Sequence, residues 1–212
     1  MNSKSILIVS GEPNSIFLEI YFKILKFKKI KSPLILISSE KLLRLQMRKL
    51  KFKKKINILN FSSLDQYKLD NKSINLIDVK YNPAKAFEKV SKKSNSFIMK
   101  SFDIAFKILR KGQIKKFING PISKKEFLSS KYLGITEYIS KQFSKKKTCM
   151  LIYNKKLSVA PITTHLPIKL VSKKINKKNI SDKVFLINNF YVKKFGFKPK
   201  IAILGLNPHC ES

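Results

Sequence analysis

The two histidines of the sequence each follow an apolar run and a polar turn. His165 ends the segment "LSVAPITTH" and His209 ends the segment "KIAILGLNPH". Such runs are typical of strands buried in a parallel sheet, and ligands of open α/β sheets bind beyond the carboxyl ends of the strands. Two imidazoles at that edge could hold a divalent metal together with other ligands or water. The alternative is that both histidines only hydrogen-bond to local polar groups.

Two further turns carry polar side chains where a ligand could bind. "SGEPNS" contains Glu12, but it has one glycine, and no GxGxxG dinucleotide fingerprint occurs in the sequence. "NGPISKK" begins at Asn119 and leads into a predicted helix start. Backbone N–H groups there, with Lys124 or Lys125, could hold a phosphate. The simpler interpretation is that Ser123 caps the helix.

A third segment, "GITEYIS", places Thr136 and Glu137 at another predicted helix start. Taken alone, a threonine and a glutamate in this position indicate helix capping. Each of these motifs is therefore weak by itself, and the fold must decide which of them meet.

The elements that would position these residues alternate between strands and helices. Short β-branched apolar runs predict strands within residues 5–13, 33–40, 115–123, 157–167 and 200–208. Helical spacing predicts helices within residues 15–27, 84–112 and 181–196. A hairpin turn is expected at 154–156. The pattern of residues 41–81 is less clear and leaves their structure open, although "KKKINILNF" and "SINLIDV" within it could be strands at a sheet edge. This alternation predicts an α/β fold with a mostly parallel sheet.

Composition narrows the function classes. The 212 residues are 43% hydrophobic, enough to bury a core, and carry a formal net charge of +34. Nearly all of the positive charge is lysine, since Arg44, Arg48 and Arg110 are the only arginines. A/T-rich codons explain abundant Lys, Ile, Asn and Phe at least as well as a nucleic-acid partner does, although non-specific polyanion binding is expected. Cys149 and Cys210 form no CxxC pair, which indicates a reducing, cytoplasmic setting, and no apolar window predicts a membrane span.

The order of the motifs carries more information than any one of them. "SGEPNSI", "FINGPISKKEF", "GITEYIS", "TTHLPI" and "AILGLNPHCES" follow one another along the chain. Together they resemble the signature segments of the 4-hydroxythreonine-4-phosphate dehydrogenase family of pyridoxal phosphate biosynthesis. The resemblance implies an isopropylmalate-dehydrogenase-like α/β/α sandwich and a homodimer with its active site at the subunit interface. It also implies oxidation of a phosphorylated hydroxy amino acid by NAD or NADP, followed by decarboxylation.

The same resemblance implies roles for particular residues. His165 and His209 match two of three histidines that hold a divalent metal (Zn, Mg or Co), and Thr136 matches a substrate-contacting threonine. The third histidine, a catalytic lysine and much of the cofactor site are expected in a C-terminal part that follows Ser212 in the family. The 212 residues are thus expected to form the first two thirds of the fold, with a possible division into 1–130 and 131–212. Alone, they are expected to lack dehydrogenase activity and to retain metal weakly.

Two departures from the family pattern bear on function. Ile135 stands where the family has a substrate-contacting histidine, and "NSIFLE" replaces a glycine-rich continuation after Gly-Glu-Pro. The first departure leaves open a related dehydrogenase-decarboxylase that acts on another hydroxy acid. Two alternatives come from other classes of protein. One is a basic nucleic-acid-binding protein, and the other is an incomplete fold without enzymatic function that is stable only as a dimer.

Overall fold

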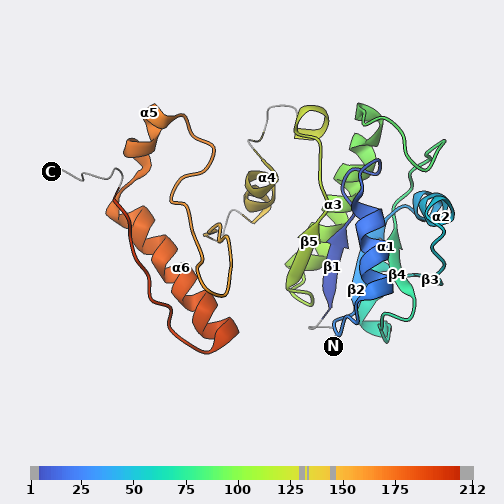
Figure 1. Ribbon diagram of the computed structural model, residues 1–212, viewed down its shortest axis with the longest axis horizontal. Coiled ribbons are helices and arrows are strands. Elements are labelled where there is room, and N and C mark those ends of the chain that lie inside the picture. Colours follow the sequence, from blue (N-terminus) through green and yellow to red (C-terminus); the bar gives the residue numbers. More distant parts are fainter. Residues whose placement is uncertain (1–4, 129–131, 133, 144–146, 206–212) are drawn as a thin grey trace. The chain divides into compact units, whose positions relative to one another are not determined.

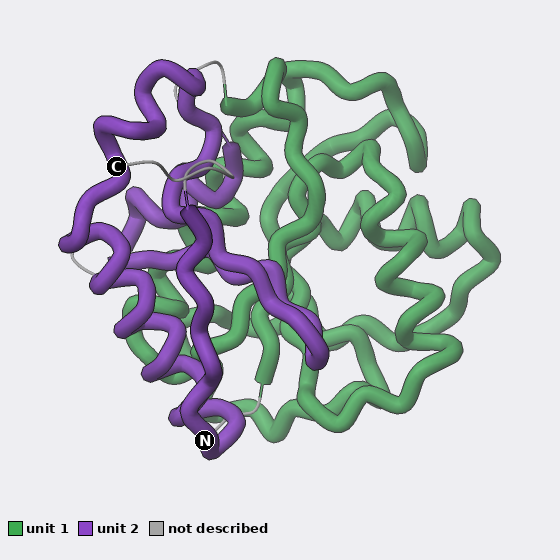
Figure 2. The backbone as a smooth tube through the Cα atoms, turned by 60° about the vertical axis from the view of Figure 1, so that its left-hand side comes forward, with its two compact units in different colours: residues 1–132 green, residues 133–212 purple. Residues whose placement is uncertain are grey.

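The computed structural model describes residues 5–128, 132, 134–143 and 147–205. The backbone forms two compact units, residues 1–132 and residues 133–212, which are coloured separately in Figure 2. We describe each unit by itself.

A five-stranded parallel sheet forms the centre of the first unit, in the strand order β3-β4-β2-β1-β5 (Figure 1). The strands are β1 (Ile6–Val9), β2 (Leu34–Ser38), β3 (Ile56–Ile58), β4 (Ile74–Asp78) and β5 (Lys116–Asn119). The helices of this unit are α1 (Phe17–Phe27), α2 (Glu40–Lys49) and α3 (Asn95–Arg110). Shorter helical turns span Phe61–Gln66, Lys92–Ser94 and Lys124–Leu128. The predicted α/β fold with a parallel sheet is confirmed.

The three central strands, β1, β2 and β4, are buried on both faces, as their continuous apolar runs predict. Alternate residues such as Ile8 and Leu36 pack with buried side chains of α1 and α2. The opposite face carries Leu7, whose partner on β5 is Phe117, and Phe117 contacts Phe102 of α3 at a ring-centroid distance of 6.3 Å. Helices therefore cover both faces, and the carboxyl ends of the strands meet at one edge.

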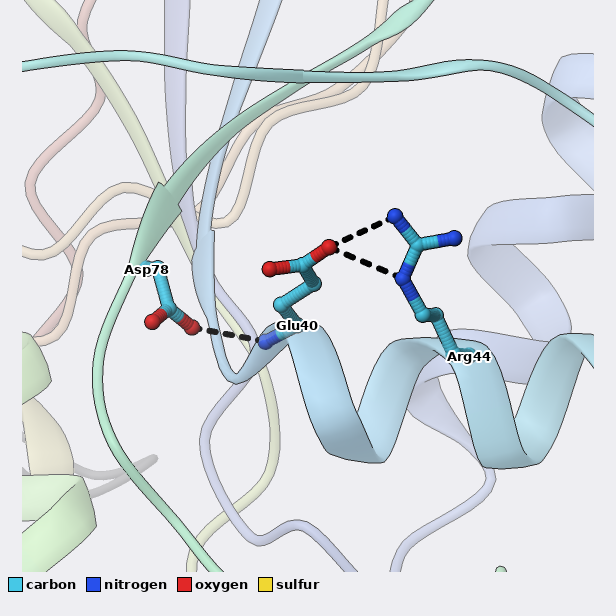
Figure 3. Close-up of polar contacts among 3 residues, drawn as sticks. All are labelled: Glu40, Arg44 and Asp78. Atoms are coloured by element: carbon cyan, nitrogen blue, oxygen red, sulfur yellow. Dashed lines mark hydrogen bonds and ion pairs between the residues drawn. The ribbon is translucent and has the colours of Figure 1, made fainter.

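Helix α2 lies in a segment whose structure the sequence left open, and two polar groups fix its start. The Ser39 hydroxyl accepts a hydrogen bond from the Leu42 amide at 3.3 Å, as an N-cap does. The Asp78 carboxylate, at the end of β4, accepts from the Glu40 amide at 2.7 Å, and Glu40 in turn pairs with Arg44 at 2.6 Å (Figure 3). Carboxylates near a helix N-terminus also interact favourably with its dipole.

The predicted helix over residues 84–112 is correct only in its second part, because α3 begins at Asn95. Side chains hold the preceding stretch in an irregular conformation. The Glu88 carboxylate accepts from the amides of Ala84 and Lys85, and the Gln46 amide donates to the Ala86 carbonyl. The Ala86 carbonyl is thus taken from the helical ladder, whereas the amides of Ala84 and Lys85, which would be in the first turn, would have no partner within a helix.

The second unit is built from helices and irregular chain. Its helices are α4 (Ile135–Gln142), α5 (Ile168–Val171) and α6 (Lys177–Phe195), with a short turn at Ser172–Lys174. Helix α6 starts four residues before the predicted Ser181, because the Asn176 side chain caps it by accepting from the Asn179 amide at 2.9 Å. It ends at Gly196, as predicted, with a left-handed φ of 78°.

The strands predicted within residues 157–167 and 200–208 are not formed in the described residues. Val159 makes a single antiparallel bridge with Ile152, around the predicted turn at 154–156, and residues 200–205 are irregular. Leu157 and Leu204 are exposed rather than buried. A strand needs a neighbouring strand to accept its hydrogen bonds, and beyond that one bridge the described part of this unit supplies none. In the described part of the chain, no helix is long and apolar enough to span a membrane.

Candidate functional site

The turns after β1 and β5 are packed directly against each other. The Gly120 amide donates to the Val9 carbonyl at 2.7 Å, and the Glu12 amide donates to the Pro121 carbonyl at 2.8 Å. Gly11 has a left-handed φ of 71°, and a Cβ on it would lie 2.3 Å from the Pro121 oxygen. Backbone therefore fills the space that a phosphate-binding loop would need to leave open.

The Glu12 carboxylate connects two segments of this packed edge by hydrogen bonds. Its side chain is buried, its Oε1 accepts from the Asn14 amide at 3.2 Å, and its Oε2 accepts from the Ser94 hydroxyl at 2.9 Å. Both oxygens thus have donors, and the carboxylate links the turn after β1 to the residue that precedes α3. This arrangement stabilises the edge and leaves Glu12 no free oxygen for a ligand.

Ser123 and Asn119 form local bonds. The Ser123 hydroxyl accepts from the Glu126 amide at 3.1 Å, which favours the capping interpretation of "NGPISKK". The Asn119 amide group donates to the Gly120 carbonyl at 3.1 Å. Burial raises the pKa of Tyr81, whose ring contacts that of Phe97 at a centroid distance of 5.1 Å.

The second unit brings the "GITEYIS" and "TTHLPI" segments together. The Thr164 hydroxyl donates to Oε1 of Glu137 at 3.0 Å, which ties the first turn of α4 to the turn that carries His165. His165 is exposed and has a left-handed φ of 54°, an uncommon conformation for a residue with a side chain. Thr136, next to Glu137, is also exposed. The structure thus brings His165 and the Thr136–Glu137 pair, predicted as separate features, into one cluster.

Gly134 lies at the centre of this cluster. A Cβ built on it would be 2.9 Å from Oε2 of Glu137 and 3.7 Å from Nε2 of His165. Its φ of −170° is ordinary extended backbone, so the glycine is needed for space rather than for conformation. Oε2 of Glu137 is buried and has no hydrogen-bond partner among the described residues.

Sequence reasoning assigned Glu137 to helix capping and so missed its link to Thr164. The N-cap of α4 is Gly134, which has no side chain to form a capping box. The glycine three residues before the glutamate was the available signal.

The placement of the other candidate ligands limits what can be said of a metal. His209 and Cys210 lie outside the described residues. Among the residues that are described, no three His, Cys, Asp or Glu side chains gather closely enough to hold a metal ion. Cys149 is a free thiol whose pKa is raised by burial.

A cavity of about 410 Å³ lies next to the Thr163–Thr164 turn in the second unit. Lys147 on its wall pairs with Asp182 at 2.5 Å. Its lining includes polar and basic side chains that suit an anion: Lys147, Thr148, Thr163, Thr164, Lys174, Asn179 and Lys183. Neither His165 nor Glu137 lines it.

Comparison with known proteins assigns the family. The model of the family described as "Pyridoxal phosphate biosynthetic protein PdxA" matches residues 29–212. The chain belongs to the PdxA family. The resemblance seen in the five sequence motifs is thereby confirmed.

Two curated PdxA relatives match nearly all of the chain. The protein of Sulfurihydrogenibium sp. (strain YO3AOP1) is 36% identical over 213 residues, which cover 96% of this chain and 63% of the relative. The protein of Aquifex aeolicus (strain VF5) is 33% identical over 215 residues, covering 98% and 64%. Both are named 4-hydroxythreonine-4-phosphate dehydrogenase. The chain thus spans just under two thirds of the length of these relatives.

Solved structures support the fold. The 4-hydroxythreonine-4-phosphate dehydrogenase of Klebsiella pneumoniae has a TM-score of 0.80 at 23% identity, over 98% of this chain and 65% of that one. The Burkholderia phymatum enzyme has a TM-score of 0.80 at 22% identity, over 97% and 63%. At these identities the likeness concerns the fold alone.

Proposed function

We propose that the protein to which this chain belongs is a 4-hydroxythreonine-4-phosphate dehydrogenase of pyridoxal phosphate biosynthesis. It would oxidise the hydroxyl group of 4-phosphohydroxy-L-threonine with NAD or NADP and release carbon dioxide from the resulting β-keto acid. PdxA family membership and relatives of that name support the reaction. The observation that carries the assignment to a site is the cluster of Gly134, Glu137, Thr164 and His165.

The donors of this cluster fit a divalent cation. His165 presents an exposed imidazole, which is an ordinary ligand of Zn and similar divalent ions, and the Glu137 carboxylate beside it has an oxygen without a donor among the described residues. We propose that His165 and His209 hold the cation, which when bound would polarise the reacting oxygen and stabilise the enolate left by decarboxylation. The exposed Thr136 hydroxyl, two residues beyond Gly134, would hydrogen-bond the substrate.

The test is formation of reduced nicotinamide from 4-phosphohydroxy-L-threonine by the protein as its gene encodes it. Each 1.36 kcal/mol of lost transition-state stabilisation is tenfold in rate, and a metal contributes several kcal/mol. We therefore expect His165→Ala to lower kcat/KM by about a hundredfold or more. Lys169→Ala, at an exposed position four residues away, is the control and should have little effect. Absence of turnover with the wild-type protein, or an unaffected His165→Ala variant, would contradict the proposal.

A second candidate is favoured by Ile135, a half-buried apolar side chain at the first position of α4 beside Thr136. Isoleucine cannot hydrogen-bond a substrate, so the protein could act on a different hydroxy acid by the same oxidation and decarboxylation. Comparing kcat/KM for phosphorylated and unphosphorylated hydroxy acids decides between the two. A higher kcat/KM for an unphosphorylated hydroxy acid would support the second candidate. A selective rise in kcat/KM for the phosphorylated substrate on Ile135→His would show that Ile135 is the residue that disfavours this substrate.

The assembly is also a proposal. We infer a homodimer with the active site at the subunit interface, which the family resemblance supports. Light scattering coupled to size-exclusion chromatography measures the mass of the particle directly, and a monomeric mass for the catalytically active protein would contradict the inference.

A further inference from the structure

We propose that Glu137 is a positioning residue for His165, whose carboxylate accepts a hydrogen bond from the ring Nε2–H and leaves Nδ1 to face the bound cation. The inference rests on the proposed function in one respect, namely that His165 is a ligand. The position of the carboxylate itself is a property of the second unit and is argued from its contacts.

The first step is that the Glu137 carboxylate is anchored. Its Oε1 accepts from the Thr164 hydroxyl at 3.0 Å, and Thr164 directly precedes His165. The bond joins two segments that are 27 residues apart in sequence, the start of α4 and the histidine turn. Because one oxygen of the carboxylate is held by this bond, the position of the other oxygen is restricted.

The second step concerns that other oxygen. Oε2 is buried without a donor among the described residues, and leaving a buried acceptor unsatisfied costs about 1–3 kcal/mol. Such groups are rare in folded proteins, which indicates that a donor is meant to reach this one. Both Oε2 and Nε2 of His165 lie within 3.7 Å of a single point, the place where a Cβ of Gly134 would be. Both groups thus border the same small space, and the exposed imidazole is the one that has to turn for its N–H to reach the oxygen.

The third step is the chemistry of metal-ligating histidines. Such a histidine commonly donates the N–H of its second nitrogen to a carboxylate, which fixes the tautomer and the ring orientation. Because Nε2 is the nitrogen on the Glu137 side, Nδ1 is the nitrogen left for the cation. The side chain of Thr136 lies outside this arrangement, at the exposed neighbouring position.

Gly134 gives the arrangement a specific signature. Since its φ of −170° is open to any residue, Gly134→Ala introduces no backbone strain. Its new Cβ would lie 2.9 Å from Oε2 of Glu137, closer than carbon and oxygen pack, so the carboxylate must turn away. The variant thus tests the direction of the carboxylate without removing it.

Nuclear magnetic resonance of the chain with ¹⁵N-labelled histidine is the direct test, because only two imidazoles contribute and His165→Ala identifies their signals. We expect a His165 Nε2–H proton that is protected from exchange in the wild-type chain and in Glu137→Gln, whose amide oxygen still accepts. The protection should be lost in Glu137→Ala and Gly134→Ala. Thr163→Val is the control, since it is the Thr164 hydroxyl and not that of Thr163 that bonds Glu137, and it should retain the signal. A ring proton that is unprotected in the wild type, or unchanged in Glu137→Ala, overturns the proposal.

Zinc affinity provides the second readout and separates the two proposals. Loss of such a carboxylate partner weakens metal binding about 10–100-fold, which is the decrease we expect for Glu137→Ala. Zinc affinity is measured on the protein as its gene encodes it. If that protein binds no zinc but shows the protected proton, the metal role of His165 is contradicted and the hydrogen bond is upheld. Equal zinc affinity in the wild type and in a folded Glu137→Ala variant would contradict the positioning role. Circular dichroism establishes folding, and Thr164→Val, which keeps the glutamate but removes its anchor, gives an intermediate loss if the proposal is right.

Discussion

The close approach of the turns after β1 and β5 predicts that Gly120→Ala is strongly destabilising. A Cβ on Gly120 would lie 2.1 Å from the Ser10 carbonyl oxygen, 2.6 Å from the carbon of that carbonyl, and 3.0 Å from Cγ of Phe17. The first two are backbone atoms, which cannot move aside as the end of a side chain can. The substitution therefore has to separate the two turns.

The cost follows from what that separation disturbs. Overpacking a well-packed site costs about 1–3 kcal/mol. Moving the turns apart also weakens the bonds from Gly120 to Val9 and from Glu12 to Pro121, each with a net value of about 1 kcal/mol. We expect the free energy of unfolding to fall by about 3–5 kcal/mol. Gly120 is not among the left-handed glycines, so none of this loss comes from φ.

Gly11 and Gly112 allow the cost of a steric clash to be distinguished from the cost of a left-handed backbone conformation. Gly112 has a φ of 75° and no atom within 4 Å of a built Cβ, so Gly112→Ala should cost only the conformational term of about 1–2 kcal/mol. Gly11 combines a φ of 71° with a 2.3 Å approach, so Gly11→Ala should cost more than Gly120→Ala. Urea unfolding followed by circular dichroism measures all three. If Gly120→Ala costs no more than Gly112→Ala, the packing of the two turns described above is wrong.

Three further predictions concern stability and charge. Asn71 bonds the carbonyls of Ile30 and Ser32 and the amide of Leu34, each at 2.9 Å, so Asn71→Ala should lower the free energy of unfolding by about 2–4 kcal/mol in urea titrations, and an unchanged value would contradict it. Burial raises the pKa of the Tyr21 phenol, so the folded state holds that proton more tightly, and the resulting stability is full below about pH 10 and is lost above it. The difference in unfolding free energy between the wild type and Tyr21→Phe should therefore be constant up to about pH 10 and change by about 1.4 kcal/mol per pH unit above it, whereas a flat difference would show an unshifted phenol. The net charge of +34 predicts DNA binding that lacks sequence preference and falls steeply between about 50 and 200 mM salt, and sequence-selective binding that survives this salt range would favour a nucleic-acid function instead.

The strands of the first unit are predicted well from the sequence because they hydrogen-bond to one another in a single sheet. β1, β2 and β5 lie within the predicted ranges, and β3 and β4 arise from the two segments expected to be strands. The runs of β1, β2 and β4 are buried between helices, and all five runs lie next to another strand of the sheet, so local β-propensity and tertiary context agree. Only β3 is at the edge as expected, since β4 lies between β3 and β2. Helix α2 was missed although Ser39 is a local N-cap signal, and the bond from Asp78, 38 residues away in sequence, is the part of its start that no local pattern shows.

At the candidate site, by contrast, the sequence pattern did not predict the structure that forms. The apolar run before His165 predicted a buried strand, yet residues 157–167 contribute only the bridge at Val159, because β-propensity expresses packing against neighbours rather than a fixed backbone preference. His165 is instead presented by a turn with left-handed backbone, and what holds that turn is the bond from Thr164 to Glu137. No periodicity within either segment encodes this bond, since its two partners belong to motifs that are each explained locally by capping or by a strand end. The glycine before "ITE" is the one residue whose type depends on both motifs, because a side chain there would meet the carboxylate from one and approach the imidazole from the other. Substitution of Gly134 therefore tests the site more specifically than substitution of either polar partner does.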